Sequence, residues 1–129
     1  MKVKIELHTN KGIETFYRDV QTKEEVYRLP LVGWFIKSRK EKFQDWDIDL
    51  FLRRRHDDDG KEYGEIIAGA VTTPASRWKR VHTSYLIGTV YTQEEIDQLA
   101  QWLREISFKT DIGYTVKRRN NKKKTSQGV

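Results

Sequence analysis

The stretch that decides the fold joins a strand to an amphipathic helix and reads Val90-Tyr91-Thr92-Gln93-Glu94-Glu95-Ile96-Asp97-Gln98-Leu99. Thr92 and Glu95 form a capping box, in which the hydroxyl and the carboxylate each accept a hydrogen bond from a backbone amide at the helix start. Apolar side chains then recur on one helical face, at Ile96, Leu99, Ala100, Leu103 and Ile106. The stretch therefore predicts a long amphipathic C-terminal helix from Glu94 to Ser107.

The segments before this helix alternate between apolar and polar residues, which is typical of strands. We expect strands over residues 2–9, 13–20, 46–55, 63–71 and 78–91, with hairpin turns at Asn10-Lys11-Gly12 and Asp57-Asp58-Asp59-Gly60. We also expect a short strand from Leu31 to Lys37, a loop from Ser38 to Phe43 and a last edge strand from Gly113 to Lys117. The pattern predicts an α+β fold with an antiparallel β-sheet, one short helix and the long C-terminal helix.

The short helix begins in a second stretch of the same kind, from Val20 to Leu29, with a capping box at Thr22 and Glu25. We expect Pro30 to end it. The likeness of residues 20–29 to residues 90–99 indicates either a duplicated strand–strand–helix unit or one capping solution used twice. The match covers only ten residues, which favours the second interpretation.

Positive charge is concentrated at the C-terminal end. The chain has 129 residues, with 25 Lys or Arg and 19 Asp or Glu. Six of the basic residues and none of the acidic ones fall between Lys117 and Val129, so the other 19 basic residues balance the 19 acidic ones. We expect a single domain at residues 1–117 and a basic, disordered tail at residues 118–129. Such a tail either solubilises the chain or contacts phosphates of nucleic acid.

Several classes of protein are excluded or disfavoured by composition. Cysteine is absent, which excludes a disulfide scaffold, a thiolate zinc site and a cysteine nucleophile. No apolar run approaches the roughly 20 residues that span a bilayer. The residues from Met1 to Glu6 alternate like a strand and lack the apolar block of a signal peptide. We therefore expect a soluble cytoplasmic protein without a membrane partner.

Two clusters invite a catalytic or metal-binding interpretation. The run from His56 to Gly60 holds possible metal ligands, but consecutive side chains cannot all point at one ion, and Asp-Gly suits a hairpin turn. His82 and Ser84 have the spacing of one half of a two-histidine phosphoesterase site, yet the comparable His8 is followed by Asn10 where a hydroxyl is needed. We therefore expect no metal, no cofactor and no enzymatic activity.

The most suggestive stretch for binding is Ser76-Arg77-Trp78-Lys79-Arg80-Val81-His82. Tryptophan offers a flat face to a base, and arginine offers paired donors to phosphate. The candidate ligand-binding residues are Tyr27, Arg28, Arg53, Arg55, Arg77, Trp78, Arg80 and His82. We expect Arg53, Arg55, Arg77 and Arg80 to gather around one concave spot. The amides after Thr22 and Thr92 are further candidate anion donors.

In general character the chain resembles small accessory proteins of bacteriophages, and within these the Thoeris anti-defence sponge proteins. The resemblance lies in the β-rich N-terminal part, the C-terminal helix and the positions Arg28, Arg53, Trp78 and Arg80. It implies an oligomer that binds an anionic, nucleotide-derived signal without cleaving it, in the host cytoplasm. Trp102 beside the Leu99 and Leu103 stripe also favours a homo-oligomer.

The sequence thus predicts a non-enzymatic protein that sequesters a nucleotide-like, phosphorylated small molecule. One alternative is a nucleic-acid-binding protein that uses the basic tail. A second is a protein-interaction module that inhibits a partner through exposed aromatic residues.

Overall fold

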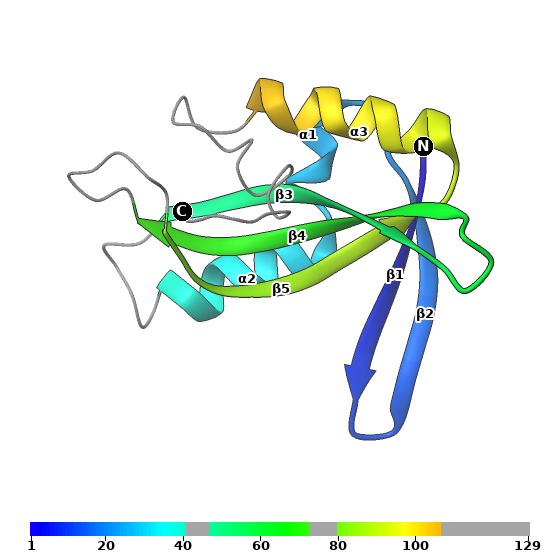
Figure 1. The fold of residues 1–129 in the computed structure, drawn as a ribbon. Coiled ribbons are helices and arrows are strands. Elements are labelled where there is room, and N and C mark those ends of the chain that lie inside the picture. Colours follow the sequence, from blue (N-terminus) through cyan, green and yellow to red (C-terminus); the bar gives the residue numbers. More distant parts are fainter. Residues whose placement is uncertain (41–46, 73–79, 107–129) are drawn as a thin grey trace.

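A computed structural model describes residues 1–40, 47–72 and 80–106 of the chain. The elements run in the order β1 (Lys2–Thr9), β2 (Gly12–Asp19), α1 (Lys23–Val26), α2 (Pro30–Lys40), β3 (Asp47–His56), β4 (Glu62–Thr72), β5 (Arg80–Val90) and α3 (Gln93–Ile106). The strands form an antiparallel sheet in the order β2-β1-β5-β4-β3 (Figure 1). The predicted α+β class with an antiparallel sheet is confirmed. The expected strand from Gly113 to Lys117 and the tail at 118–129 lie outside the described residues.

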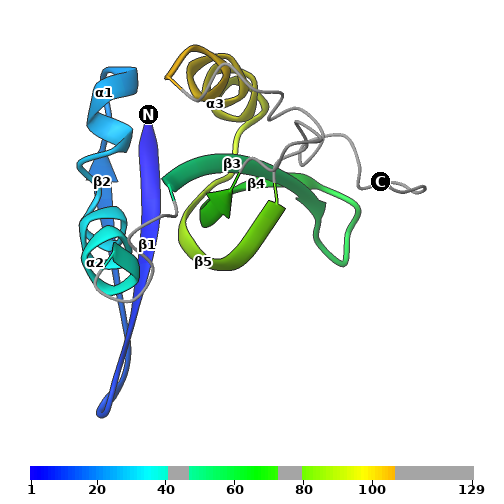
Figure 2. The same cartoon turned by 90° about the vertical axis from the view of Figure 1, so that its left-hand side faces the viewer.

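The sheet has two parts, a three-stranded meander and a projecting hairpin. The meander is formed by β3, β4 and β5, which pair along most of their lengths. The hairpin is formed by β1 and β2, paired without a break from Lys2 opposite Asp19 to Thr9 opposite Gly12. Its turn end extends away from the meander in both views (Figures 1 and 2). The two parts are joined in the ladder at one pair, Lys4 opposite Thr89.

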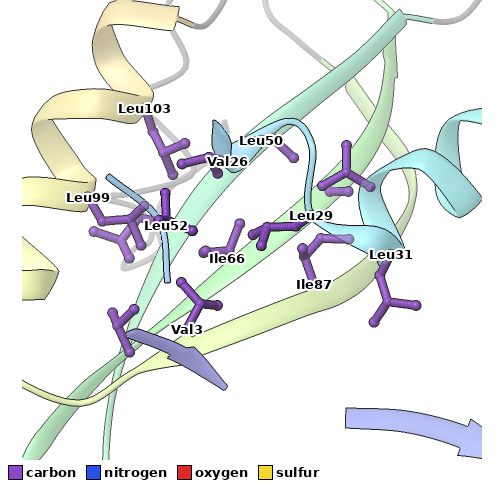
Figure 3. Close-up of a cluster of buried hydrophobic side chains, with 14 of the residues drawn as sticks. Val3, Val26, Leu29, Leu31, Leu50, Leu52, Ile66, Ile87, Leu99 and Leu103 are labelled. Carbon is purple, nitrogen blue, oxygen red and sulfur yellow. The ribbon is translucent and has the colours of Figure 1, made fainter. Parts of the chain in front are cut away.

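The main hydrophobic core lies between one face of the sheet and the three helices. Figure 3 shows Leu99 and Leu103 of α3 meeting Leu50 and Leu52 of β3 and Ile66 of β4. The hairpin contributes Val3 and Ile5, and the α1–α2 segment contributes Val26, Leu29, Leu31, Val32 and Phe35. Because neighbouring residues of a strand point to opposite faces, Phe51 lies on the other side of the sheet. There it packs with Ile67 and Val71 in a second, smaller cluster.

The segment from Leu31 to Lys37 is helical, and the strand predicted there is wrong. It belongs to α2, which begins at Pro30 and also includes the first three residues of the loop predicted from Ser38 to Phe43. Proline suits the first turn of a helix because its fixed φ is helical. It also loses no hydrogen bond there, since amides in the first turn have no acceptor within the helix. Leu31, Val32 and Phe35 are buried in the main core at helical spacing. The apolar run therefore reflects one helical face.

Glutamate side chains cap both strand-to-helix junctions, as predicted. Glu25 accepts hydrogen bonds from the backbone amides of Gln21 and Thr22, at 2.7 and 2.9 Å. At α3 the Glu95 amide donates to the Thr92 hydroxyl at 3.1 Å, and Glu95 accepts from the Thr92 amide at 3.3 Å. Glu95 also accepts a bond of 2.9 Å from the Lys2 amide, which ties the start of β1 to α3.

The predicted turn between β3 and β4 is confirmed. Gly60 has a φ of 82°, a conformation that favours glycine, and its amide donates to the Asp57 carbonyl at 3.0 Å. The Asp57 carboxylate accepts hydrogen bonds from the amides of Asp59 and Lys61. The Asp57 carboxylate therefore stabilises the turn.

Candidate functional site

Arg53 and Arg55 lie on one face near the end of β3, and both turn toward Glu65 of β4. The Arg53 Nε lies 2.8 Å from the Glu65 Oε1, and the Arg55 Nε lies 3.8 Å from the same oxygen. Glu65 is largely buried, with 12% of its side chain exposed, whereas each arginine is half exposed. One carboxylate thus neutralises part of the charge that was expected to meet a ligand.

The backbone position of Arg80 lies at the opposite end of the sheet from Arg53 and Arg55, which does not fit the expected gathering of these three arginines around one spot. Arg80 stands opposite Thr72 of β4, whereas Arg53 stands opposite Glu65. Those β4 positions are about 23 Å apart at the ~3.3 Å rise of a strand. The cause is the meander itself, because in antiparallel strands the end of β3 and the start of β5 lie at opposite ends of the sheet. Arg77 and Trp78 lie outside the described residues.

The other described candidate residues lie in two further places. His82 is exposed near the Arg80 end, where its Nε2 lies 2.8 Å from the Thr72 hydroxyl. Tyr27 and Arg28 follow α1 on the helical side of the sheet. Arg28 is exposed, but Tyr27 packs half-buried against the main core. Burial and the nearby Asp49 carboxylate raise the pKa of Tyr27 to about 12.

The capping boxes engage the amides at both ends of the first helical turn. The Thr22 amide donates to Glu25, and the Thr92 amide donates to Glu95. The Glu95 amide donates to the Thr92 hydroxyl. Anion binding by the amides directly after Thr22 and Thr92 stays a prediction.

A cavity of about 320 Å³ lies instead where β1 separates from β5. Its lining is Lys4, Glu6 and His8 from β1 and the run from Tyr85 to Thr89 of β5. The three β1 side chains alternate with Val3, Ile5 and Leu7, which face the main core. The three polar β1 residues of the cavity therefore lie on the face of the sheet that the helices leave free. Tyr85 and Ile87 of its lining belong to the side of the main core. The cavity lies close to the pair Lys4 and Thr89.

Gly88, which lines this cavity, allows β5 to approach β1 closely at Val3 and Lys4. A Cβ atom at this position would lie 2.5 Å from the Val3 Cγ1 and 3.1 Å from the Lys4 carbonyl oxygen. Any larger residue would force the Val3 side chain or the β1 backbone to shift. Tyr85, which also lines the cavity, packs its ring against Trp34 of α2, with the ring centroids 4.9 Å apart.

Lys4 is the cation of the cavity. Its Nζ donates a hydrogen bond of 3.4 Å to the Tyr91 hydroxyl and lies 3.6 Å from the Glu6 carboxylate. The bond to Tyr91 and the nearby negative charge raise the pKa of Lys4 above its ordinary value. Lys4 therefore stays protonated at neutral pH, beside the Glu6 carboxylate.

Tyrosine rings surround Lys4 on the same face. Tyr17 of β2 stands opposite Lys4, and the Lys2 ammonium lies 5.5 Å from the centre of the Tyr17 ring. The Lys4 ammonium lies over the Tyr91 ring, 5.7 Å from its centre. The centres of the Tyr91 and Tyr63 rings are 6.1 Å apart. Tyr17 and Tyr91 are 54% and 42% exposed. We call Lys2, Lys4, Tyr17, Tyr63 and Tyr91 the tyrosine–lysine surface.

Sequence reasoning missed Lys4, Glu6 and the tyrosine–lysine surface as candidate site residues. The alternation of β1 shows that Lys4, Glu6 and His8 share one face. Their partners on β5 are more than 70 residues away, however, and no local pattern shows which strands become neighbours. The signal available was the density of titratable residues on that face.

Comparison of the chain with models of protein families, with curated proteins and with solved structures finds no match. In the described part of the chain no three His, Asp or Glu side chains cluster as metal ligands would. None of the helices in that same part has the length and apolar character needed to cross a lipid bilayer.

Proposed function

We propose that the protein binds a small, anionic, nucleotide-like molecule in the cavity between β1 and β5 and holds it without chemical conversion. The observation that supports this is the lining of the cavity, which sets a protonated lysine, a carboxylate and an imidazole against the apolar residues Leu86 and Ile87. Ligand sites commonly combine an apolar surface with a few polar groups of this kind. The cavity volume of about 320 Å³ lies near the lower end of such sites.

The chemistry of the lining suggests which part of the ligand lies where. Lys4 suits a phosphate or another anionic group, because its ammonium is a compact positive charge with three donors. Glu6 accepts hydrogen bonds and so suits the hydroxyl groups of a ribose or an exocyclic amine. The exposed rings of Tyr17 and Tyr91 beside Lys4 offer flat faces on which a base can stack.

This placement assigns the binding role to Lys4 rather than to Arg53, Arg55 or Arg80. The resemblance to Thoeris anti-defence sponge proteins fits a binder without turnover, and that biological role stays a prediction. So does the contribution of Arg77 and Trp78, which lie outside the described residues.

The first test is to identify what the purified protein carries. Mass spectrometry of the supernatant after heat denaturation should reveal an anionic ligand, and calorimetric titration with a panel of mono-, di- and cyclic nucleotides should reproduce its binding. Lys4→Ala should weaken that binding at least about tenfold, as loss of one charged hydrogen bond does. Arg53→Ala removes an equal charge from the same sheet face and should leave the affinity for the ligand unchanged. Equal affinity for the Lys4→Ala and wild-type proteins would refute the proposed site.

A second candidate function is binding of single-stranded nucleic acid across the tyrosine–lysine surface. Stacking on aromatic rings beside lysine residues is a common basis of such binding. The three rings of this surface come from β2, β4 and the residue after β5, so they span the sheet rather than one pocket.

Length and salt dependence distinguish the two candidates. A nucleic-acid surface should bind longer oligonucleotides more tightly and lose affinity as salt rises. Binding of a small ligand should be independent of length beyond one or two nucleotides. A chain shortened after Val116 shows whether the sheet or the basic tail is responsible for nucleic-acid binding, because it keeps the tyrosine–lysine surface and removes the tail.

A further inference from the structure

The outer edge of the sheet is formed by β2, which no other described strand covers. This strand pairs with β1 over its eight residues without a bulge. Each of its side chains is exposed except Phe16, which is half-buried, and Ile13 and Tyr17 are 59% and 54% exposed. A long, regular and exposed edge is a template for pairing with another strand.

The hydrogen bonds of the hairpin show which backbone groups this edge presents. Met1 and Val20 exchange both bonds, since the Val20 amide donates to the Met1 carbonyl at 2.7 Å and the Met1 amine donates to the Val20 carbonyl at 3.0 Å. In antiparallel strands such pairs alternate with pairs whose groups point outward. Ile13, Thr15, Tyr17 and Asp19 therefore direct their backbone N–H and C=O groups away from β1.

The side chains of β2 are complementary to those of a second, antiparallel β2. With the two-fold axis at Phe16, Glu14 stands opposite Arg18 of the second copy, and Arg18 stands opposite its Glu14. Phe16 then meets Phe16, while Thr15 and Tyr17 exchange the outward backbone bonds. Opposite charges and aromatic pairs at directly facing positions both stabilise a sheet. Glu14–Arg18 and Phe16–Phe16 fall at the closely spaced pairs, where side chains interact best.

Other registers lose this match. A shift of one residue sets outward backbone groups opposite inward ones, so no ladder forms. A shift of two residues sets Phe16 opposite either Glu14 or Arg18, which removes both ion pairs. The charges are available for pairing, because neither Glu14 nor Arg18 takes part in a salt bridge within the described ranges. The Arg18 guanidinium lies 5.3 Å from the Phe16 ring, which keeps it on the face shared with Glu14.

We propose that the protein forms a symmetric dimer through β2, with the two-fold axis at Phe16, so that two five-stranded sheets become one continuous sheet. This surface differs from the Trp102 face of α3 on which the sequence suggested an oligomer, and Trp102 packs against the main core. The proposal is independent of the ligand site.

Charge reversal provides the decisive test. The full chain is studied by sedimentation equilibrium, where wild type should dimerise. Glu14→Arg and Arg18→Glu each place like charges opposite one another and should raise the dimer dissociation constant at least about tenfold. An equimolar mixture of the two variants should form a heterodimer, because both facing pairs then carry opposite charges. Lys11→Glu, a reversal at the hairpin turn outside β2, serves as the control and should dimerise like wild type.

Cross-linking tests the register itself, since the chain contains no cysteine. Phe16→Cys should give a disulfide-linked dimer on mild oxidation, because facing Cα atoms in such a pair lie within disulfide reach. Ile13→Cys should not, because the two copies of that position lie six residues apart along the strands. A wild-type chain that stays monomeric, or a dimer that survives Glu14→Arg unchanged, would overturn the proposal.

Discussion

Lys4 of β1 stands opposite Thr89 of β5, and this is the pair through which the hairpin joins the meander. On one side of this pair the start of β1 is tied to α3 by the bond between Lys2 and Glu95. On the other side the strands separate and form the cavity lined by Glu6 and His8. The attachment of the hairpin and the shape of the cavity therefore depend on the same few contacts.

Gly88 is predicted to control this attachment. Gly88→Ala brings a methyl group within 2.5 Å of the Val3 side chain and 3.1 Å of the Lys4 carbonyl. Overpacking of this kind costs about 1–3 kcal/mol of unfolding free energy. We expect that loss in chemical denaturation, together with weaker ligand binding.

Gly33 of α2 is the matched control, because a Cβ there would meet no atom within 4 Å. Gly33→Ala should raise the free energy of unfolding by about 0.5–1 kcal/mol, the usual gain in a helix. Equal effects of the two substitutions would contradict the close approach at Gly88.

Glu95 is predicted to stabilise the protein in its charged form. Burial opposes its ionisation, but hydrogen bonds from the amides of Lys2 and Thr92 outweigh burial and lower its pKa below the ordinary value of 4.5. Glu95→Gln should therefore cost about 1–2 kcal/mol at pH 7. The advantage of wild type is present above pH 4.5 and is lost as the pH falls through the lower pKa of the folded state.

Glu94→Gln provides the comparison for Glu95, because it removes the same charge from the first turn of α3 at an exposed position. Denaturation curves of the two variants at pH 7 and at pH ~3 should differ at pH 7 and converge at the lower pH. A difference that persists unchanged at low pH would mean that the charge of Glu95 is not responsible.

Much of the fold could be predicted because its signals are local. The caps at Thr22 and Thr92 and the turn at Asp57 each depend on residues within four positions of one another. The segment after Pro30 was misassigned because proline is compatible with both the end of one helix and the start of the next. The buried positions Leu31, Val32 and Phe35 have helical spacing, and that period was the signal to follow.

The candidate site was harder to predict because it depends on which strands become neighbours. Lys4 and Thr89 are far apart in the chain, and a sheet in the order β2-β1-β5-β4-β3 brings them together. The separation of Arg53 from Arg80, by contrast, followed from the predicted strands. Three successive antiparallel strands necessarily place the end of the first and the start of the third at opposite ends of the sheet.

The ion pairs of Glu65 are predicted to differ in strength. A double-mutant cycle of Arg53→Ala and Glu65→Ala should give a coupling free energy of about 0.5–1 kcal/mol, as expected for a partly exposed pair. The Arg53 Nε lies 2.8 Å from Glu65 and the Arg55 Nε lies 3.8 Å away, so the corresponding cycle with Arg55 should give less. Both couplings should fall in 1 M salt, where exposed charges are screened. A larger coupling for Arg55 would contradict the geometry of the pairs.

Tyr27 is predicted to make the protein sensitive to alkaline pH. Its half-buried ring and the nearby Asp49 carboxylate raise its pKa to about 12, from an ordinary value of 10.0. Below pH 10 the folded and unfolded chains both hold the phenol proton, so the contribution to stability is constant. Between pH 10 and 12 the unfolded chain releases the proton while the folded chain retains it, so stability falls as the pH rises through this range. Phenylalanine cannot ionise, so the Tyr27→Phe variant should become more stable relative to wild type by at most about 1.4 kcal/mol per pH unit between those values. Urea denaturation of both proteins from pH 9 to 12 measures this, and parallel stability curves would show that Tyr27 ionises equally readily in the folded and unfolded chains.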